Sequence, residues 1–266
     1  MVVLKMLYNS QNIAREFLEE VKSHVTMNNA GGYVIQCYGM SKDSKTNNFI
    51  VVMEYKKNGS LRHYLDKNYY SIPWIEKLYI LNNIAKGLSN IHEKGFVHRD
   101  FHSGNILKGD GFDALITDLG LSRPADQDQK DNTIHGVLPY VAPEVLMKNK
   151  YTEKSDIYSL GMICYEVIAG IPPFHDVPHQ AHLAFDIIKG LRPKFKIKVP
   201  KLLLDLINQC WDKDPMKRPN ARKIHEMIYE WWLDLDVQCY VMMKAYSMNF
   251  EINDDIDFEN DEDGDE

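Results

Sequence analysis

The sequence has few cysteines and no long apolar run, and these two absences narrow the class of protein. It holds four cysteines in 266 residues, with no Cys-x-x-Cys pair and no histidine spacing typical of zinc. Two disulfides are conceivable, but so few cysteines in a chain of this size favour a reduced, intracellular protein. No window approaches the ~20 apolar residues of a membrane span, and the apolar start Met1–Leu4 is too short for a signal core. We therefore expect a soluble cytoplasmic protein without a membrane span.

A broad excess of positive charge is also absent. The formal net charge is −7, and residues 251–266 hold ten acidic residues without any Lys or Arg. Removing those ten charges leaves the first 250 residues at +3, too near neutrality for a broad nucleic-acid-binding surface. We therefore expect no nucleic-acid partner. The acidic segment has little to bury, and its composition predicts disorder.

Apolar periodicity predicts strands in the first part of the chain and helices in the rest. Short strands are expected at 2–4, 33–38 and 49–55, with a helix at 12–24 and a polar hairpin turn at 41–48. The main helices are expected at 61–66, 74–94, 157–169, 202–211 and 221–232. The change from strands to helices falls near residues 55–59.

A set of polar residues at fixed spacing points to phosphoryl transfer. That chemistry needs a carboxylate to orient the attacking hydroxyl and oxygen ligands to hold magnesium against the phosphates. Asp100 suits the first task, and Asn105 and Asp118 suit the second. Taken singly, Asp100 is better explained as a capping carboxylate and Asp118 as a turn residue. The whole spacing, His98-Arg99-Asp100-x4-Asn105 followed by Asp118-x-Gly, is typical of protein kinases.

Further motifs occur in the order that this family has, so the chain resembles a eukaryotic protein kinase of the tyrosine-kinase-like type. They are Val2-Val3-Leu4-Lys5, the helical Glu20, Val51–Tyr55 with Asn58–Leu61, Ala142-Pro143-Glu144, Asp156–Gly161, and Cys210–Pro215 with Arg218-Pro219. The resemblance implies an α+β, two-lobed fold. Residues 1–55 would form a truncated N-lobe with a small antiparallel sheet and the αC helix, and 56–232 a mainly helical C-lobe. Residues 233–266 would form a C-terminal extension that ends in the acidic tail.

The resemblance also implies a site for ATP and Mg²⁺. Lys5 and Glu20 would pair to hold the α- and β-phosphates, although a lysine near a terminus is more often a surface residue. Asp100 would orient the substrate hydroxyl, while Asn105 and Asp118 would ligate Mg²⁺. The residues implied around the nucleotide are Val3, Met53, Glu54, Tyr55, Lys56 and Leu107.

Other matched residues are implied to be structural. Glu144 and Arg218 match a buried ion pair in which loss of one partner leaves an uncompensated charge. Asp156 is expected to organise the catalytic loop rather than to bind metal. His98 is expected in the core and not as a base.

The sequence departs from the family's pattern where the chemistry takes place. No Gly-x-Gly-x-x-Gly run occurs, which leaves open whether the sequence is truncated or its nucleotide lid is incomplete. We expect the chain beginning at Met1 to bind Mg-ATP poorly and to associate through the exposed edge of its first strand. His102 stands where Ser/Thr kinases usually carry a lysine, and Val137 where they carry a threonine that braces the catalytic aspartate.

The sequence thus predicts an ATP-dependent protein kinase that phosphorylates Ser or Thr of a protein substrate, with Tyr left open. The alternative is a catalytically weak or inactive kinase-like module that scaffolds or regulates protein partners. The absent glycine loop, His102 and Val137 favour the module. The enzyme is favoured by retention of all five residues that the chemistry needs, because a module without turnover is free to lose them. These are Lys5, Glu20, Asp100, Asn105 and Asp118.

Overall fold

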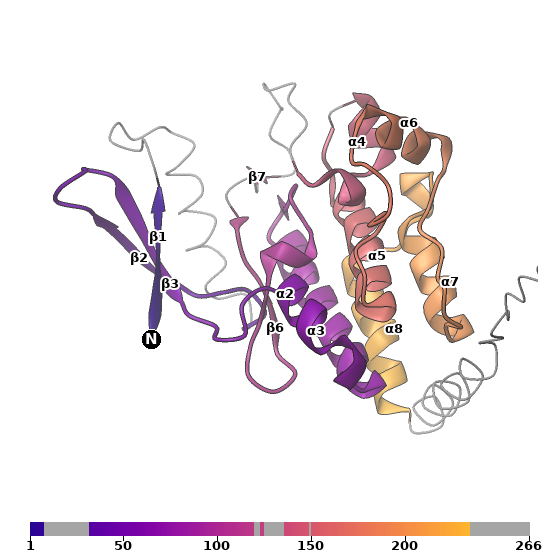
Figure 1. Cartoon of the computed structure of the whole chain (residues 1–266), viewed down its shortest axis with the longest axis horizontal. Helices are drawn as coiled ribbons and strands as arrows, with labels where there is room; N and C mark the ends of the chain where they lie inside the picture. The colour runs from indigo at the N-terminus through magenta and orange to yellow at the C-terminus, as the bar shows by residue number, and fades with distance from the viewer. Residues whose placement is uncertain (8–31, 120–122, 125–135, 149, 235–266) are drawn as a thin grey trace, which may run out of the picture.

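The computed structural model describes residues 1–7, 32–119, 123–124, 136–148 and 150–234. In these ranges a small antiparallel sheet precedes a larger, mainly helical part, so the expected α+β architecture is confirmed (Figure 1). The helix expected at 12–24, Glu20 within it, and the acidic tail all lie outside the described residues. None of the described helices is long and apolar enough to cross a membrane.

The described sheet has the order β1-β3-β2 and is antiparallel throughout. Its strands are β1 (Val2–Leu7), β2 (Cys37–Lys42) and β3 (Phe49–Glu54). The prediction of a strand at 33–38 was wrong in its bounds, because residues 33–35 bond to another strand. The amide of Ile35 donates to Ile116 O (2.8 Å), and the amide of Ile116 donates to Tyr33 O (2.9 Å). Strand β2 therefore begins later and runs into the polar segment that was expected to be a turn.

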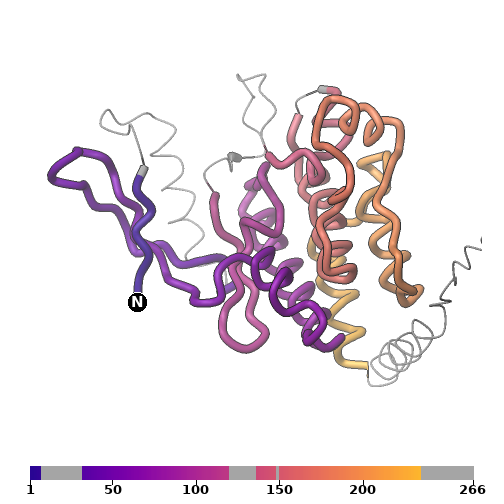
Figure 2. The backbone as a smooth tube through the Cα atoms, in the orientation of Figure 1, coloured from indigo at the N-terminus to yellow at the C-terminus, as the bar shows by residue number. Residues whose placement is uncertain are grey.

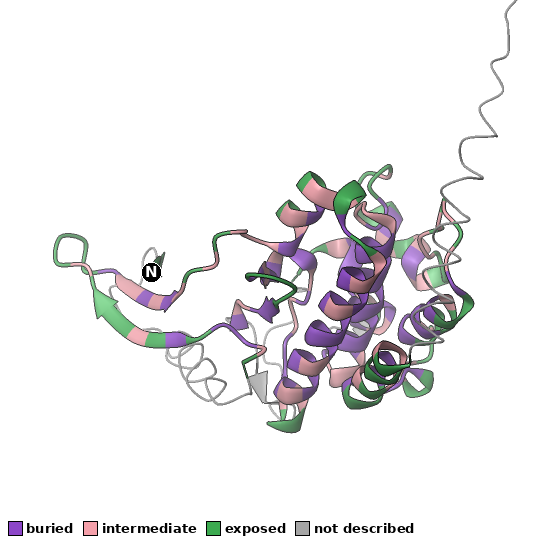
Figure 3. Cartoon of the chain, turned by 90° about the horizontal axis from the view of Figure 1, so that it is seen from below, coloured by how far each residue is buried: buried purple, intermediate pink, exposed green. Residues whose placement is uncertain are grey.

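Burial is concentrated in the helical part and is sparse in the sheet (Figure 3). The sheet has a small apolar cluster of its own, which consists of Ile35, Cys37, Val51 and Met53. Phe49 and Leu107 pack against this cluster. Because Leu107 comes from β5 (Ile106–Lys108), it joins the sheet to the helical part.

The helical part is built around α5 (Glu153–Ala169), which Figure 1 places among its neighbours. The others are α2 (Leu61–Asn68), α3 (Trp74–Glu93), α4 (Pro143–Lys148), α6 (Ala181–Lys189), α7 (Lys201–Cys210) and α8 (Ala221–Leu233). A reciprocal capping box between Thr152 and Ser155 starts α5, and Gly170 ends it with φ 75°. From Ser155 to Ile168 every residue of α5 is buried, as its nearly continuous apolar character predicts.

Residues 96–119, which hold short strands and a turn, lie between the sheet and α5 (Figure 2). The strands are β4 (Phe96–Val97), β5, β6 (Ala114–Ile116) and β7 (Arg123–Pro124), with β4 paired to β7 and β5 paired to β6. Single 3₁₀ turns cover Tyr69–Ser71, Ser103–Asn105, Leu138–Tyr140 and Pro215–Lys217. The loop after β4 and the end of β6 supply the polar residues of the candidate site.

Candidate active site

A buried carboxylate fixes the loop that carries Asp100. Asp156 Oδ2 accepts the amide of His98 (2.7 Å) and Oδ1 accepts the amide of Arg99 (3.0 Å). Its Oδ2 also lies 2.9 Å from His92 Nε2. Arg99 has φ 73°, a left-handed conformation that costs a non-glycine residue of order 1–3 kcal/mol unless its surroundings hold it. Asp156 thus acts as the organiser of this loop.

His98 ties the same loop to the end of β6. Its ring is fully buried, and burial lowers its pKa. The amide of Asp100 donates to Nδ1 (3.3 Å), so the proton of the neutral ring lies on Nε2, which is 3.1 Å from Thr117 O. Both ring nitrogens form hydrogen bonds with backbone groups. His98 therefore holds the loop in shape and is not placed to act as a base.

The predicted polar residues come together as two pairs joined through Thr117. Asn105 Nδ2 donates to Asp100 O (2.9 Å) and Oδ2 (3.1 Å). Lys5 Nζ lies 2.8 Å from Asp118 Oδ1, with the two side chains 34% and 41% exposed. The amide of Thr117 donates to Asn105 O (2.9 Å), which places Asp118 next to Asn105. A lysine, two carboxylates and an amide therefore meet at one partly open place.

The carboxylate of Asp100 is half enclosed and anionic. Burial acts to raise its pKa, but His102, together with His98 and Asn105, holds the pKa of Asp100 below its ordinary value. Asp100 Oδ1 is buried, and His102 Nε2 lies 3.5 Å from it, at the outer limit of a hydrogen bond. On the other side, a Cβ on Gly136 would lie 3.3 Å from this oxygen. An anionic carboxylate in such a place can accept a hydrogen bond from a hydroxyl.

The ring of His102 is held in one orientation. The amide of Gly104 donates to its Nδ1 (3.1 Å), so the neutral ring carries its proton on Nε2, toward Asp100. Gly104 also makes room for the ring, because a Cβ there would come within 2.7 Å of it. The ring of Tyr140 lies 5.8 Å from that of His102, centroid to centroid. His102 is thus a built part of the site.

A buried network anchors Tyr140, and the sequence reasoning missed it. The hydroxyl of Tyr140 donates to Glu166, whose side chain is fully buried in α5. Arg62 Nη2 lies 2.5 Å from the other oxygen of Glu166 and donates to the Tyr140 hydroxyl (2.9 Å). Ser159 Oγ donates to Tyr140 O (2.7 Å). The only signal was Glu166 within the apolar second half of α5, because a buried acid needs a partner.

The residues expected around the nucleotide line the end of the sheet. Val3 of β1 lies opposite Met53 of β3, and Met53 shares its apolar cluster with Leu107. The amide of Glu54 is used, since it donates to Gln36 O (2.9 Å). Tyr55 and Lys56 follow β3 directly, and Lys56 Nζ lies 2.6 Å from Glu54 Oε1. Val3 lies two residues before Lys5 on β1, and Leu107 lies two residues after Asn105, so the same segments carry these apolar side chains and the polar pairs.

The donor set fits a magnesium ion that is shared with phosphate oxygens. Among the described residues no group of three or more His, Cys, Asp and Glu could hold a metal by itself. Asn105 uses its amide nitrogen on Asp100, which leaves its oxygen, with the Asp118 carboxylate, as hard ligands. Mg²⁺ is usually held by one or two protein oxygens with phosphates and water completing the shell. The residues present therefore suit Mg²⁺ bound together with ATP, and Lys5 adds a cation for phosphate.

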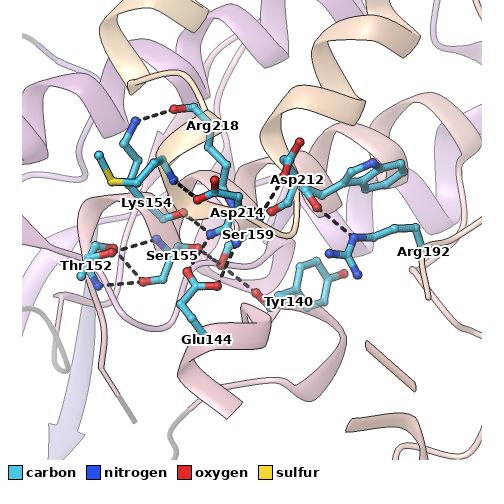
Figure 4. Close-up of polar contacts among 12 residues, drawn as sticks. Tyr140, Glu144, Thr152, Lys154, Ser155, Ser159, Arg192, Asp212, Asp214 and Arg218 are labelled. Atoms are coloured by element: carbon cyan, nitrogen blue, oxygen red, sulfur yellow. Dashed lines mark hydrogen bonds and ion pairs between the residues drawn. The ribbon is translucent and has the colours of Figure 1, made fainter. Parts of the chain in front are cut away.

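The expected ion pair between Glu144 and Arg218 is present (Figure 4). Arg218 Nη1 and Nη2 donate to the two oxygens of Glu144 at 2.7 and 2.8 Å. Arg218 is 1% exposed, and its Nε donates to Asp212 O (2.8 Å). This bidentate contact joins the segment after Tyr140 to the start of α8.

The sequence of the chain is similar to those of known protein kinases. The sequence model described as protein tyrosine and serine/threonine kinase matches residues 1–228. A probable serine/threonine-protein kinase of Dictyostelium discoideum is 32% identical over 72% of this chain and 11% of its own length. A protein kinase and PP2C-like domain-containing protein of Arabidopsis thaliana is 30% identical over 70% of this chain and 33% of its own length. The chain thus spans a third or less of these relatives.

Proposed function

Because the chain belongs to the protein tyrosine and serine/threonine kinase family, we propose that it transfers the γ-phosphate of ATP to a Ser or Thr hydroxyl of a protein. The observation that carries the proposal is the meeting of Lys5 with Asp118 and of Asp100 with Asn105, joined through Thr117. Six relatives carry names of probable serine/threonine-protein kinases, and one from Arabidopsis thaliana is named a serine/threonine/tyrosine-protein kinase. Tyrosine as acceptor is left to the experiment.

Each side chain has a task in this reaction. Mg-ATP supplies the phosphoryl group and, in the ion, a charge that offsets the phosphates. Asp118 and Asn105 would hold Mg²⁺ through oxygen, and Lys5 would offset phosphate charge at the same place. Asp100 accepts a hydrogen bond from the substrate hydroxyl and so orients its oxygen for attack. Its low pKa keeps it charged at neutral pH.

The adenine end of the nucleotide is proposed to lie against Val3, Met53 and Leu107. These apolar side chains flank the point where the sheet meets the helical part, and Glu54, Tyr55 and Lys56 provide backbone groups beside it. The same point is the proposed boundary between a first lobe, 1–55, and a second lobe, 56–232. Residues 233–266 are proposed as a separate extension.

A second candidate function is a kinase-like module that binds regulatory partners without turnover. The observation that favours it is the weak support of Asp100 Oδ1. This oxygen is buried beside Gly136, and His102 Nε2 comes no closer to it than 3.5 Å. A threonine hydroxyl at position 137 would be the usual brace, and this chain has valine there. The carboxylate is therefore held by fewer contacts than the family's pattern provides.

Transfer of radiolabelled phosphate from γ-labelled ATP to Ser, Thr and Tyr peptide mixtures separates the two functions. Asp100→Asn keeps the shape of the side chain and should lower transfer by about 10²–10⁴-fold. Asp176→Asn, at an exposed acid, is the matched control and should keep full transfer. Binding of Mg-ATP without incorporation into any peptide would overturn the enzyme in favour of the module.

A further inference from the structure

One surface segment concentrates the positive charge of the described chain. Residues 189–201 hold six Lys or Arg and no Asp or Glu. The segment follows α6 and leads into α7, at the end of the molecule opposite the sheet (Figure 1). It takes no part in the site described above.

The segment alternates between apolar and basic side chains in a way that turns its lysines outward. Phe195, Ile197 and Val199 are half-buried and pack against the main core. Lys194 and Lys198, on the alternate positions, are exposed, as is the lysine between them. Exposed lysines and half-buried apolar residues thus alternate along residues 194–199.

Arg192 fixes the start of this segment. Its Nε donates to Trp211 O (2.9 Å) and Nη1 donates to Ile187 O (3.2 Å). The guanidinium also lies 4.9 Å from the centre of the Tyr158 ring. Figure 4 shows the Arg192 side chain directed at the backbone next to Asp212, where it donates to Trp211 O. The segment that carries the exposed lysines is therefore anchored to the helical part at Arg192.

Between this segment and α7 lies a cavity of about 970 Å³. Apolar side chains that line it include Leu191, Phe195, Leu204 and Trp211. Lys194, Lys198 and Lys201 line it as well. We call this cavity, together with residues 190–201, the basic groove. It has apolar walls and a cationic rim, so it suits an extended peptide with apolar side chains among acidic ones.

The chain itself contains a peptide of that composition. Residues 251–266 hold ten acidic residues, no Lys or Arg, and the apolar residues Ile252, Ile256 and Phe258 among the acids. Sixteen residues, 235–250, separate this segment from the last described residue. Extended at about 3.3–3.6 Å per residue, they reach about 55 Å. A globular lobe formed by residues 56–232 has a radius of gyration of about 16 Å and a diameter of about 40 Å, so the reach exceeds the diameter of the lobe.

We propose that residues 251–266 dock in cis on the basic groove. Ile256 and Phe258 enter the apolar part of the cavity, and the flanking carboxylates lie against Lys194, Lys198 and their neighbours. A tether of this length keeps the acidic segment at a local concentration of about millimolar near the groove. The contact depends on salt, because exposed charges are screened beyond about 8 Å at physiological ionic strength.

Zero-length carbodiimide crosslinking of the full chain tests this docking. The expected product is a monomeric species in which peptides from 190–201 are joined to peptides from 251–266. Lys194→Glu combined with Lys198→Glu should lower the yield of this species about ten-fold. Lys42→Glu combined with Lys45→Glu, on the hairpin of the sheet, is the matched control and should leave the yield unchanged.

Reversal of the acidic partners provides the second arm. Asp254→Lys, Asp255→Lys and Asp257→Lys together should lower carbodiimide crosslinking to the wild-type groove. A contact between the two segments is instead detected by disulfide trapping of Lys196→Cys with Asn260→Cys. This pair is introduced into the wild-type chain, into each charge-reversed chain and into the chain that combines both reversals. Trapping should fall in each single reversal and recover when both segments are reversed. Joining only between two chains, with a yield that rises with protein concentration, overturns docking in cis. Equal yields in the groove variant and the hairpin control overturn the groove as the site.

Discussion

The backbone of Gly136 lies close to the Asp100 carboxylate. A Cβ atom added at Gly136 would be 3.3 Å from Asp100 Oδ1. Gly136 also has φ 102°, which side-chain-bearing residues rarely adopt. The residue therefore meets two demands, one of backbone conformation and one of space beside Asp100. A variant can separate them because Gly190 has a similar φ of 113° with nothing within 4 Å of its Cβ position.

Gly136→Ala should lower phosphate transfer about ten-fold or more, because the added methyl displaces the Asp100 carboxylate from its position. Gly190→Ala should lose a similar stability of about 1 kcal/mol and keep its activity. Urea unfolding and steady-state kinetics on both variants check this. Equal activity of the two alanine variants would mean that the approach of Gly136 to Asp100 does not matter for the reaction.

His102 should act as a positioning residue for Asp100. Its ring is oriented by the amide of Gly104 and faces Asp100 through Nε2. His102→Ala should lower kcat about ten-fold with little change in KM for ATP. His102→Lys should recover most of the rate, because an ammonium at this place also contacts the carboxylate and the transferred phosphate. A purely packing role would instead give two variants that are equally slow.

The Glu144–Arg218 pair should be worth far more to stability than an exposed pair. Glu144→Gln leaves Arg218 buried without its anion, and the expected cost is about 3–5 kcal/mol in the free energy of unfolding. Glu226→Gln removes the partner of Arg222 in a pair whose side chains are 55% and 71% exposed, and should cost under about 0.5 kcal/mol. Chemical denaturation of both variants measures the difference. Similar costs would contradict the assignment of Glu144 and Arg218 as a structural pair.

Lys77 should make stability depend on alkaline pH. Burial lowers its pKa to about 8 from an ordinary 10.5, between the rings of Tyr69 (3.9 Å) and Trp74 (5.3 Å). Between those two pH values the unfolded chain binds more protons than the folded chain, so the stability contribution of Lys77 rises with pH. Lys77→Met should therefore gain about 2 kcal/mol over the wild type at pH 7.5, and less at pH 9.5. Urea titrations at both pH values check this, and a constant difference would contradict it.

The polar part of the site could be predicted from spacing because short motifs fix it. Asp100 and Asn105 lie on one loop, and Asp118 follows the strand that pairs with the strand after Asn105, so their meeting follows from local chain geometry. Lys5 lies 113 residues away in sequence from Asp118, and only the resemblance to a family could place it there.

What could not be predicted depends on partners far apart in the chain. Arg62, Tyr140 and Glu166 come from three elements, and no local pattern joins them. The bounds of β2 depended on the bonding of residues 33–35 to Ile116, which competes with an otherwise ordinary strand signal. The sequence marked His102 as a departure from the kinase pattern, but the orientation of its ring depends on a hydrogen bond from the amide of Gly104 that only the structure shows.

In the proposed function Asp118, beside Lys5, holds the metal for phosphate transfer from ATP. Magnesium-dependent ATP turnover by the full chain, by Asp118→Asn and by Asp110→Asn tests it most directly, since Asp110 is an exposed acid paired with Lys57. We expect ATP turnover to fall about 10³-fold or more in Asp118→Asn and to stay at the wild-type level in Asp110→Asn. All three proteins should have the same circular dichroism spectrum of a folded chain. Undiminished turnover in Asp118→Asn would contradict it.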